Sequence, residues 1–472
     1  MEAKEKKQTT FADACRWVRN VMESRWRAAD DGEKSRLLER EKRAIMGYEE
    51  EIASYKDMIR EILKDAGLGA IDVPDWYRSA EDGIFAELYG LAGLSPWVYD
   101  ETEAYRRSSS AKLIGERLYC LIDGVSVLQP QRISRERREQ LRRALLLSAP
   151  LERTEKGFHE IYLHNGIRLT IYAGERTKEE QDVMVFRKYL LQELSFRQLA
   201  GLGTIPEEAI PLFHSMIRIG FNVLIGGPVR SGKTTFLQVW QREEDPKLEG
   251  LAISTDPETP WHVLMPDAPI MQLVADGEAE LAGLTKSLLR GDNDYVLLEE
   301  MRDAPAYRLL LEITAIGTRR CKCTVHTQDP AGLPYRIASA IRGRYGGDEQ
   351  NMLQQIFQNF HYVFVFAQEE SNRARKKLYS ISEYCYEPES GKACVHTICR
   401  YDAVRDRWNW NAHLGKDKKE IGTLWPEEVR KMKKLLAELA QRNPLMEKTT
   451  IYPRYFEPNR KDSAPERGRT DG

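Results

Sequence analysis

A glycine-rich segment near the middle of the chain has the spacing of a phosphate-binding loop. Residues 227–234 read Gly-Pro-Val-Arg-Ser-Gly-Lys-Thr and match the pattern G-x-x-x-x-G-K-[ST]. Successive backbone N–H groups of such a loop surround nucleotide phosphates, and the partial positive charge at the start of the following helix adds to the attraction. The segment, called the P-loop below, therefore predicts a site for ATP with Mg²⁺.

The residues of the P-loop have separate expected roles. Lys233 is expected to pair with the β- and γ-phosphates, and Thr234 is expected to place its hydroxyl on Mg²⁺. The remaining residues are expected to contact phosphate through their backbone. The predicted nucleotide-binding residues of this segment are Gly227, Pro228, Val229, Arg230, Ser231, Gly232, Lys233, Thr234 and Thr235.

Two carboxylates end the apolar segment Asp294-Tyr-Val-Leu-Leu-Glu-Glu300. In P-loop enzymes the corresponding strand ends beside the phosphates. One acid there can hold the water shell of the metal, and the next can polarise the attacking water. We therefore expect Glu300 to be the catalytic base and Glu299 to be a second carboxylate close to the Mg²⁺.

Two further side chains near this edge could act on phosphate. Arg302 could steady the Glu300 carboxylate, reach a phosphate across a subunit boundary, or form a surface ion pair of little consequence. His326 follows an apolar segment at the edge where parallel sheets bind their ligands. We expect His326 to sense the γ-phosphate or to couple the nucleotide to the rest of the protein, and a purely structural histidine is the alternative.

The segments around these residues alternate between apolar strands and helical stretches, which is typical of a parallel sheet covered by helices. The expected fold class is α/β, with a RecA-like P-loop core. An antiparallel hairpin is expected at residues 362–367 and 378–386, and a helix is expected over Pro426–Arg442. The predicted buried strands of the core are Phe221–Ile225, Leu251–Ser254, Tyr295–Leu298 and Cys323–Val325.

The part of the chain before the core has a different pattern. Apolar residues three and four apart predict one amphipathic helix over about residues 30–65. A predicted strand at Leu118–Ile122, a helix over Ser134–Leu147 and a hairpin turning at His164-Asn-Gly166 indicate a smaller α+β domain. The expected domains are a helical extension (1–80), the α+β domain (81–200), the RecA-like ATPase domain (201–415), and a C-terminal helix with a disordered tail (416–472).

Composition narrows the classes of partner. The chain of 472 residues is long enough for more than one domain, and its 71 basic and 73 acidic residues give a net charge of −2. We therefore expect no nucleic-acid partner. No apolar run approaches the roughly 20 residues that span a bilayer, and the N-terminus lacks the apolar core of a signal peptide. The expected location is the cytoplasm, at most peripheral to a membrane.

The seven cysteines form no regular framework, which fits a reducing compartment. Cys385, Cys394, His396 and Cys399 lie close together in the sequence. Their spacings match no standard set of zinc ligands, so we expect no metal site built from these four residues.

The order of the motifs resembles that of the secretion and pilus traffic ATPases, the family that powers type II and type IV secretion and type IV pilus assembly. Leu298-Glu-Glu-Met-Arg302 is similar to the family's Gly-Glu-x-Arg, and Thr324-Val-His326 is similar to its His box. The resemblance runs from about residue 84 to 410. It is greatest for the Tad/Flp pilus and conjugation branches.

This resemblance implies further roles. It assigns the catalytic and sensor roles to Glu300 and His326. It adds Glu258 as a catalytic residue, in a segment similar to the family's aspartate box, and Arg187 as a residue that reaches nucleotide from the N-terminal domain. It also implies a homo-oligomer, most often a hexameric ring, at the inner face of the cytoplasmic membrane, where it acts on an inner-membrane platform protein.

Three functions remain open at this point. The first is an ATP-hydrolysing motor for pilus assembly or protein secretion. The second is a nucleotide-gated assembly subunit with little hydrolysis, because the segment Thr255–Glu258 has one acid fewer than the family's box, and Pro228 and Arg230 stand at usual glycine positions. The third is a DNA-handling P-loop ATPase, which the near-neutral charge disfavours.

Overall fold

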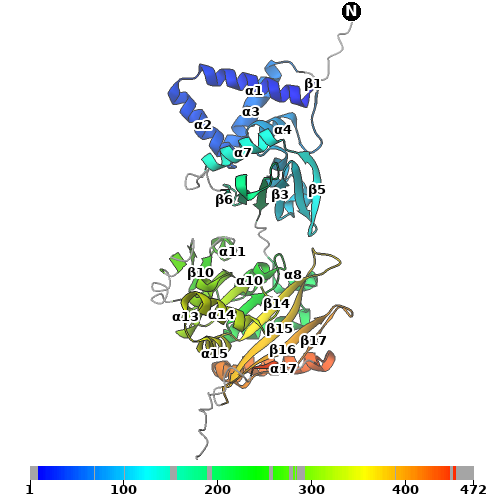
Figure 1. Ribbon diagram of the computed structural model, residues 1–472. Coiled ribbons are helices and arrows are strands. Elements are labelled where there is room, and N and C mark those ends of the chain that lie inside the picture. Colours follow the sequence, from blue (N-terminus) through cyan, green and yellow to red (C-terminus); the bar gives the residue numbers. More distant parts are fainter. Residues whose placement is uncertain are drawn as a thin grey trace, which may run out of the picture. The chain divides into compact units, whose positions relative to one another are not determined.

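The computed structural model divides the chain into two compact units, Met1–Leu191 and Gln192–Gly472 (Figure 1). Each unit has its own hydrophobic cores. The tail that the sequence predicts to be disordered lies outside the described residues. The structure describes residues 9–68, 70–99, 101–148, 157–188, 194–254, 259–275, 280–281, 283, 293–387, 390–446 and, for the backbone, 450–452.

The first unit begins with helices packed around an apolar core. One helix was expected over residues 30–65, but the structure has two, because Gly47 has a φ of +95° and ends the helical conformation. Four side chains of the second of these helices are buried in the core: Ile52, Tyr55, Ile59 and Ile62. The main helices are α1 (Phe11–Ala28), α2 (Asp31–Ile45), α3 (Glu49–Asp65) and α4 (Ala80–Leu88). Two short strands, β1 (Thr9–Thr10) and β2 (Ile71–Asp72), pair in parallel.

An antiparallel sheet with the strand order β5-β4-β3-β8-β7-β6 forms the rest of the first unit. Helix α7 (Arg135–Leu147) contributes Leu141 and Leu145 to the core of this sheet. The α+β interpretation of this region is therefore confirmed. The strands are β3 (Ser110–Ile114), β4 (Arg117–Ile122), β5 (Val125–Arg132), β6 (Phe158–Tyr162), β7 (Arg168–Tyr172) and β8 (Val183–Arg187).

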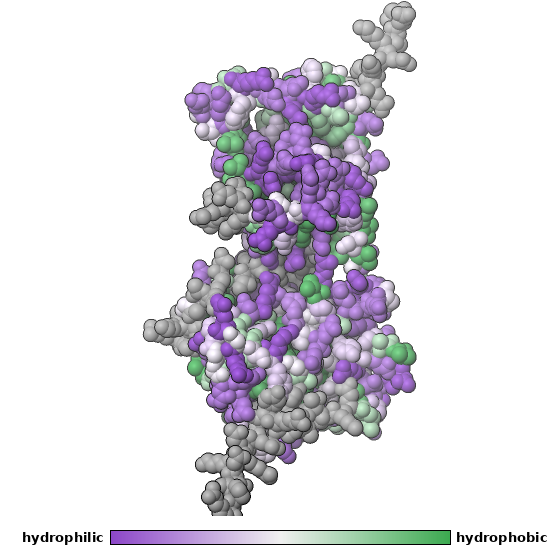
Figure 2. Space-filling view, in the orientation of Figure 1, coloured by the Kyte–Doolittle hydropathy of each residue, from purple (hydrophilic) through white to green (hydrophobic). Residues whose placement is uncertain are grey.

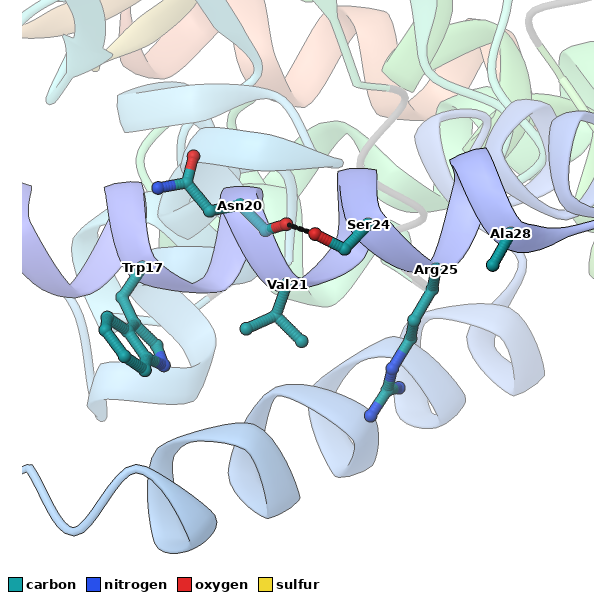
Figure 3. A pocket seen from close by; sticks show the side chains of 6 residues that line it. All are labelled: Trp17, Asn20, Val21, Ser24, Arg25 and Ala28. Atoms are coloured by element: carbon teal, nitrogen blue, oxygen red, sulfur yellow. Dashed lines mark hydrogen bonds between the residues drawn. The ribbon is translucent and has the colours of Figure 1, made fainter.

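The surface of the first unit is mainly hydrophilic on the face seen in Figure 2. Edge strand β5 is an exception, because Val125, Val127 and Leu128 are exposed. A shallow groove also runs along α1, where the Ser24 hydroxyl donates to the Asn20 carbonyl (Figure 3). The groove is lined by Trp17, Asn20, Val21, Ser24, Arg25 and Ala28. Because Arg25 is the one charged residue of this lining, these side chains do not form a catalytic or metal-binding group.

A mixed sheet organises the second unit, with the strand order β11-β10-β12-β13-β9-β14-β15-β16-β17 and with β18 on β16. The first six of these strands are parallel, and the others join by antiparallel pairing. The strands are β9 (Val223–Gly226), β10 (Gly250–Ser254), β11 (Ile270–Val274), β12 (Tyr295–Met301), β13 (Lys322–Val325), β14 (Tyr362–Gln368), β15 (Lys376–Glu387), β16 (Lys392–Asp402), β17 (Arg407–Trp410) and β18 (Thr450–Tyr452).

Helices cover both faces of this sheet, so the predicted α/β class is confirmed (Figure 1). On one face lie α8 (Phe196–Gly201), α9 (Ile210–Ile219), α10 (Lys233–Arg242), α11 (Trp261–Leu264) and α17 (Pro426–Arg442). On the other lie α13 (Ala304–Ala315), α14 (Leu333–Tyr345) and α15 (Glu349–Asn359). Among the helices that the structure describes, none is long and apolar enough to cross a membrane.

Candidate nucleotide-binding site

The P-loop connects the buried strand β9 to helix α10. Strand β9 lies between β13 and β14 in the parallel part of the sheet, and all four of its residues are buried. Helix α10 begins at Lys233, so Thr234 and Thr235 lie in its first turn. The N–H groups of a first helical turn have no partner within the helix. The loop therefore ends at a helix start that can bind an anion.

Three residues of the P-loop have left-handed backbone conformations. Gly227 has a φ of +147°, and a Cβ atom there would lie 2.4 Å from the carbonyl oxygen of Phe366. Gly232 has a φ of +93°. The third is Arg230, with a φ of +65°, a conformation that costs a residue with a side chain about 1–2 kcal/mol. Only glycine fits at position 227, whereas position 230 accepts an arginine with strain.

Lys233 lies within the curve of the P-loop. Its ammonium group donates to the carbonyl oxygens of Gly227 at 3.0 Å and Pro228 at 2.8 Å. The same nitrogen is 3.5 Å from Nδ1 of His326. Hydrogen bonds between ammonium and phosphate are stronger than those between ammonium and a neutral carbonyl. A bound phosphate can therefore draw Lys233 away from the loop carbonyls.

A connected network joins Lys233 to the three residues expected at the edge of the sheet. Nε2 of His326, just past β13, is 2.8 Å from Oε1 of Glu300 on β12. The guanidinium of Arg302 donates to the other oxygen of Glu300. With Nε2 protonated, His326 can donate to Glu300 and accept from Lys233 at Nδ1. The structure thus brings Lys233, His326, Glu300 and Arg302 together.

Opposing effects act on the pKa of Glu300. Burial alone would raise it. The hydrogen bond and charge of Arg302, followed by those of His326, outweigh burial and lower the pKa below its ordinary value. Glu300 is therefore ionised at neutral pH and accepts hydrogen bonds, but as a proton acceptor it is weaker than an unpaired glutamate.

Glu299 has different surroundings from Glu300. Side chains alternate between the faces of a strand, and Glu299 lies on the face that carries α10 and α11, where its carboxylate accepts from the indole N–H of Trp261 at 2.7 Å. A buried indole N–H needs such an acceptor. The metal-binding role of Glu299 stays a prediction.

Two residues implied by the resemblance lie elsewhere. Glu258, together with residues 255–257, is outside the described residues. Arg187 ends β8 in the first unit, where it is exposed and lies opposite Ser110 and Arg168 in the sheet register. Their contributions to catalysis and nucleotide binding stay predictions.

Lys376, which the sequence analysis missed, lies beside the P-loop. A Cβ atom at Gly232 would be 3.5 Å from its Cγ. Burial, together with the charge of Arg230, lowers the pKa of Lys376 to about 8. The predicted hairpin places Lys376 near its turn. Its closeness to the P-loop depends on the parallel pairing of β14 with β9, the strand that leads into the loop, which no local pattern specifies. Lys376 and Arg230 add two basic groups to this site.

Comparison with known proteins finds a family match over part of the chain. The model of a family described as type II/IV secretion system protein matches residues 177–397. No curated protein sequence matches the chain. Similar solved structures include the VirB11 ATPase of the Brucella suis type IV secretion system in complex with sulphate, with 16% identity, coverage of 61% of this chain and 95% of that chain, and a TM-score of 0.33.

Two further solved structures are similar to the chain. The ATPase DotB of Legionella pneumophila has 13% identity, covers 75% of this chain and 93% of its own, and gives a TM-score of 0.43. The pilus retraction motor PilT with bound ADP has 14% identity, coverage of 74% and 94%, and a TM-score of 0.43.

Proposed function

We propose that this chain is an ATP-hydrolysing motor, because residues 177–397, which contain the P-loop and the network around Glu300, match the model of the type II/IV secretion system protein family. Its work is pilus assembly or protein secretion, carried out from the cytoplasmic face of a membrane. The observation that carries the proposal is the continuous network from Lys233 through His326 and Glu300 to Arg302.

The residues present fit ATP with Mg²⁺. The hydroxyl of Ser231 is fully buried and has no hydrogen-bond partner among the described residues, and a phosphate oxygen of bound ATP would supply the missing acceptor. Thr234 and Glu299 would hold the metal, which neutralises charge on the β- and γ-phosphates. Thr235 and the loop backbone would hold the phosphates.

In the proposed reaction, a water molecule attacks the γ-phosphorus and the bond to the β–γ bridging oxygen breaks. Glu300 orients the water and accepts its proton, and Lys233 stabilises charge on the transferred group. His326 contacts both of these side chains, so it can report the state of the γ-phosphate to β13. Arg302 keeps Glu300 ionised and oriented.

Two substitutions test the assignment. Lys233→Ala is expected to abolish ATP binding, because the phosphates lose their ammonium partner. Glu300→Gln is expected to retain binding and to lower steady-state turnover by about 100-fold or more, since the general base is lost. Equilibrium binding of a fluorescent ATP analogue and phosphate release measure the two effects.

The matched control is Glu312→Gln, which removes an exposed carboxylate paired with Arg308 on α13 and should leave turnover unchanged. Normal turnover of the Glu300→Gln variant would contradict the assignment of the base.

A second candidate function is a nucleotide-gated assembly subunit that hydrolyses little ATP. The lowered pKa of Glu300 favours it, because a weaker base removes a proton less readily. The discriminating measurement is turnover of the unmodified chain at saturating ATP. Tight ATP binding with turnover equal to that of Lys233→Ala would support the gated subunit, whereas turnover well above that background supports the motor.

We further propose that the protein works as a homo-oligomer, most simply a hexameric ring, bound to an inner-membrane platform protein. The match to the family model supports this proposal. Mass measurement with and without a non-hydrolysable ATP analogue tests it, and a monomer under both conditions would contradict it.

We expect DNA to have no effect on turnover. A salt-sensitive stimulation of turnover by DNA would instead indicate a DNA-handling ATPase.

A further inference from the structure

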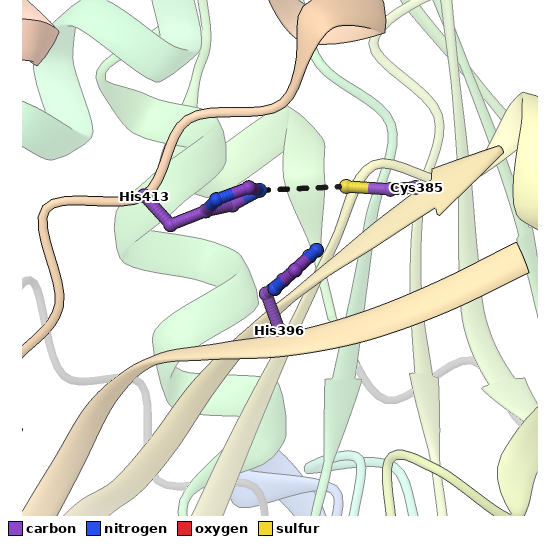
Figure 4. Close-up of side chains that lie close together, drawn as sticks. All are labelled: Cys385, His396 and His413. Atoms are coloured by element: carbon purple, nitrogen blue, oxygen red, sulfur yellow. Dashed lines mark hydrogen bonds between the residues drawn. The ribbon is translucent and has the colours of Figure 1, made fainter. Parts of the chain in front are cut away.

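A cluster of sulfur and nitrogen ligands lies in the antiparallel part of the second unit, among elements that the proposed ATPase reaction does not use. It consists of Cys385 on β15, His396 on β16 and His413 in the segment between β17 and α16 (Lys416–Ile421) (Figure 4). The strand register accounts for part of the cluster. Glu383 lies directly opposite His396, and Cys385 lies two residues further along the same face of β15.

The potential ligand atoms of the three side chains all lie within 4.8 Å of one another. Sγ of Cys385 is 4.0 Å from Nε2 of His413, and the imidazoles of His396 and His413 stack with ring centroids 3.7 Å apart. Ligand atoms around tetrahedral zinc are roughly 3.5 Å apart, given Zn–N and Zn–S bonds of about 2.0 and 2.3 Å. A small inward movement and a turn of the imidazoles would complete a three-ligand site.

The cluster also has a source of negative charge. Oε1 of the fully buried Glu383 is 3.1 Å from Sγ of Cys385 and 3.3 Å from Nε2 of His413. The carboxylate is held in place by the backbone N–H of Gly415 at 2.8 Å and the hydroxyl of Tyr362 at 2.8 Å. A buried carboxylate next to a thiol and two imidazoles favours a bound cation.

We propose that Cys385, His396 and His413 bind a zinc ion, with Glu383 supplying negative charge beside it. One thiolate and two imidazoles suit Zn²⁺ better than Mg²⁺ or Ca²⁺, which take oxygen ligands. Binding releases the Cys385 thiol proton to solvent, and the thiolate replaces its hydrogen bond to Glu383 with a bond to the metal. The ion joins the β15–β16 hairpin to the segment that leads into α16.

The proposed ligand set differs from the four residues considered in the sequence analysis, for which no metal site was expected. The expectation considered Cys385, Cys394, His396 and Cys399, whose spacing matches no zinc motif. The cluster replaces Cys394 and Cys399 with His413, which joins through the return of the chain after β17. Because that contact is set by tertiary structure, ligand spacing in the sequence does not display it.

The test is metal content and spectroscopy of the full-length protein. After incubation with Zn²⁺ and extensive dialysis, the unmodified chain should retain one equivalent of zinc by mass spectrometry. Its Co²⁺ derivative should show the near-ultraviolet absorption of a thiolate–cobalt bond. Cys385→Ser should lose both signals. His413→Ala is the second ligand variant, because its ring is 32% exposed and lies outside the strands, so the hairpin should fold without it.

The matched control is Cys394→Ser, which changes the cysteine paired directly with Cys385 but absent from the cluster. It should retain zinc and the cobalt absorption. Circular dichroism should show each variant to be folded. Zinc lost on dialysis of the unmodified chain, or retained equally by Cys385→Ser and His413→Ala, would mean an adventitious ion only and would overturn the proposal. Loss of zinc in Cys394→Ser but not in Cys385→Ser would also overturn it.

Discussion

Glu300 lies between two basic side chains, Arg302 and His326, that oppose the effect of its burial. Arg302 is the stronger of the two influences that lower the pKa of this carboxyl. For a group whose pKa is lowered on folding, the associated stabilisation is present above the unfolded pKa and is lost as pH falls through the folded pKa. The network should therefore weaken in acid, not at alkaline pH.

The first residue-scale prediction follows from that pKa. In Arg302→Ala the pKa of Glu300 should rise, because burial remains and the guanidinium is gone. Glu300 then becomes protonated at a higher pH, and protonation removes the proposed base. The acidic limb of the turnover-versus-pH profile should shift to higher pH, with little change in the affinity for ATP.

The control for this experiment is Arg308→Ala, which removes an exposed arginine of α13. Its pH profile should match that of the unmodified chain. If the acidic limb stays in place in Arg302→Ala, the protonation of Glu300 does not limit turnover. That result would support the alternative that Arg302 forms only a surface ion pair.

Single residues also show the limits of prediction from sequence. The P-loop could be predicted because its glycines and Lys233 occur in one short segment, and their spacing reflects a local backbone requirement. The hydrogen bond between Trp261 and Glu299 and the contact of Lys376 with the loop could not be predicted. Both join residues that are distant in the sequence, and neither residue type is distinctive by itself.

At the scale of elements, helix α10 is fixed at its C-terminal end by a buried ion pair. Glu244, two residues after the helix, lies 2.7 Å from the ammonium of Lys322 on β13, and Arg320 contacts the same carboxylate. Both members of the Glu244–Lys322 pair are fully buried. Burial lowers the pKa of Lys322 even though Glu244 opposes the shift. The pair therefore links the helix that follows the P-loop to the strand that precedes His326.

Breaking this pair should be costly. Glu244→Gln leaves Lys322 buried without its carboxylate partner, a change that typically destabilises a protein by about 3 kcal/mol or more. Urea unfolding should show a lower midpoint with little change in slope. Glu243→Gln is the control, because Glu243 is more exposed and its substitution should alter stability by less than about 1 kcal/mol. Equal stability of both variants would contradict a structural role for the pair.

The elements differ in how well local patterns identify them. Strands β9, β10, β12 and β13 could be predicted because parallel strands covered on both faces are continuously apolar. The single helix expected over residues 30–65 was wrong because apolar spacing continues past Gly47, while the backbone there does not stay helical. Strands β16 and β17 gave weaker signals, since polar and apolar residues alternate irregularly along them.

At the scale of the whole molecule, edge strand β5 is a candidate contact between copies of the chain. Val125 and Val127 are 56% and 41% exposed. They are two residues apart, so they share a face of the strand. Edge strands with exposed apolar side chains pair readily with other chains. In the proposed homo-oligomer, a neighbouring copy of the chain would cover these apolar side chains.

Val127→Lys tests that interpretation. A lysine at an edge strand opposes association, because its charge must be desolvated in any contact that covers it. With a non-hydrolysable ATP analogue, the variant should populate smaller species than the unmodified chain, by light scattering at equal concentration. Its folding should be unaffected, because the side chain is already exposed.

Val404→Lys is the matched control, since Val404 is 95% exposed in the turn between β16 and β17. If both variants assemble like the unmodified chain, the contact between copies lies elsewhere. If both fail alike, the added positive charge and not the position explains the loss.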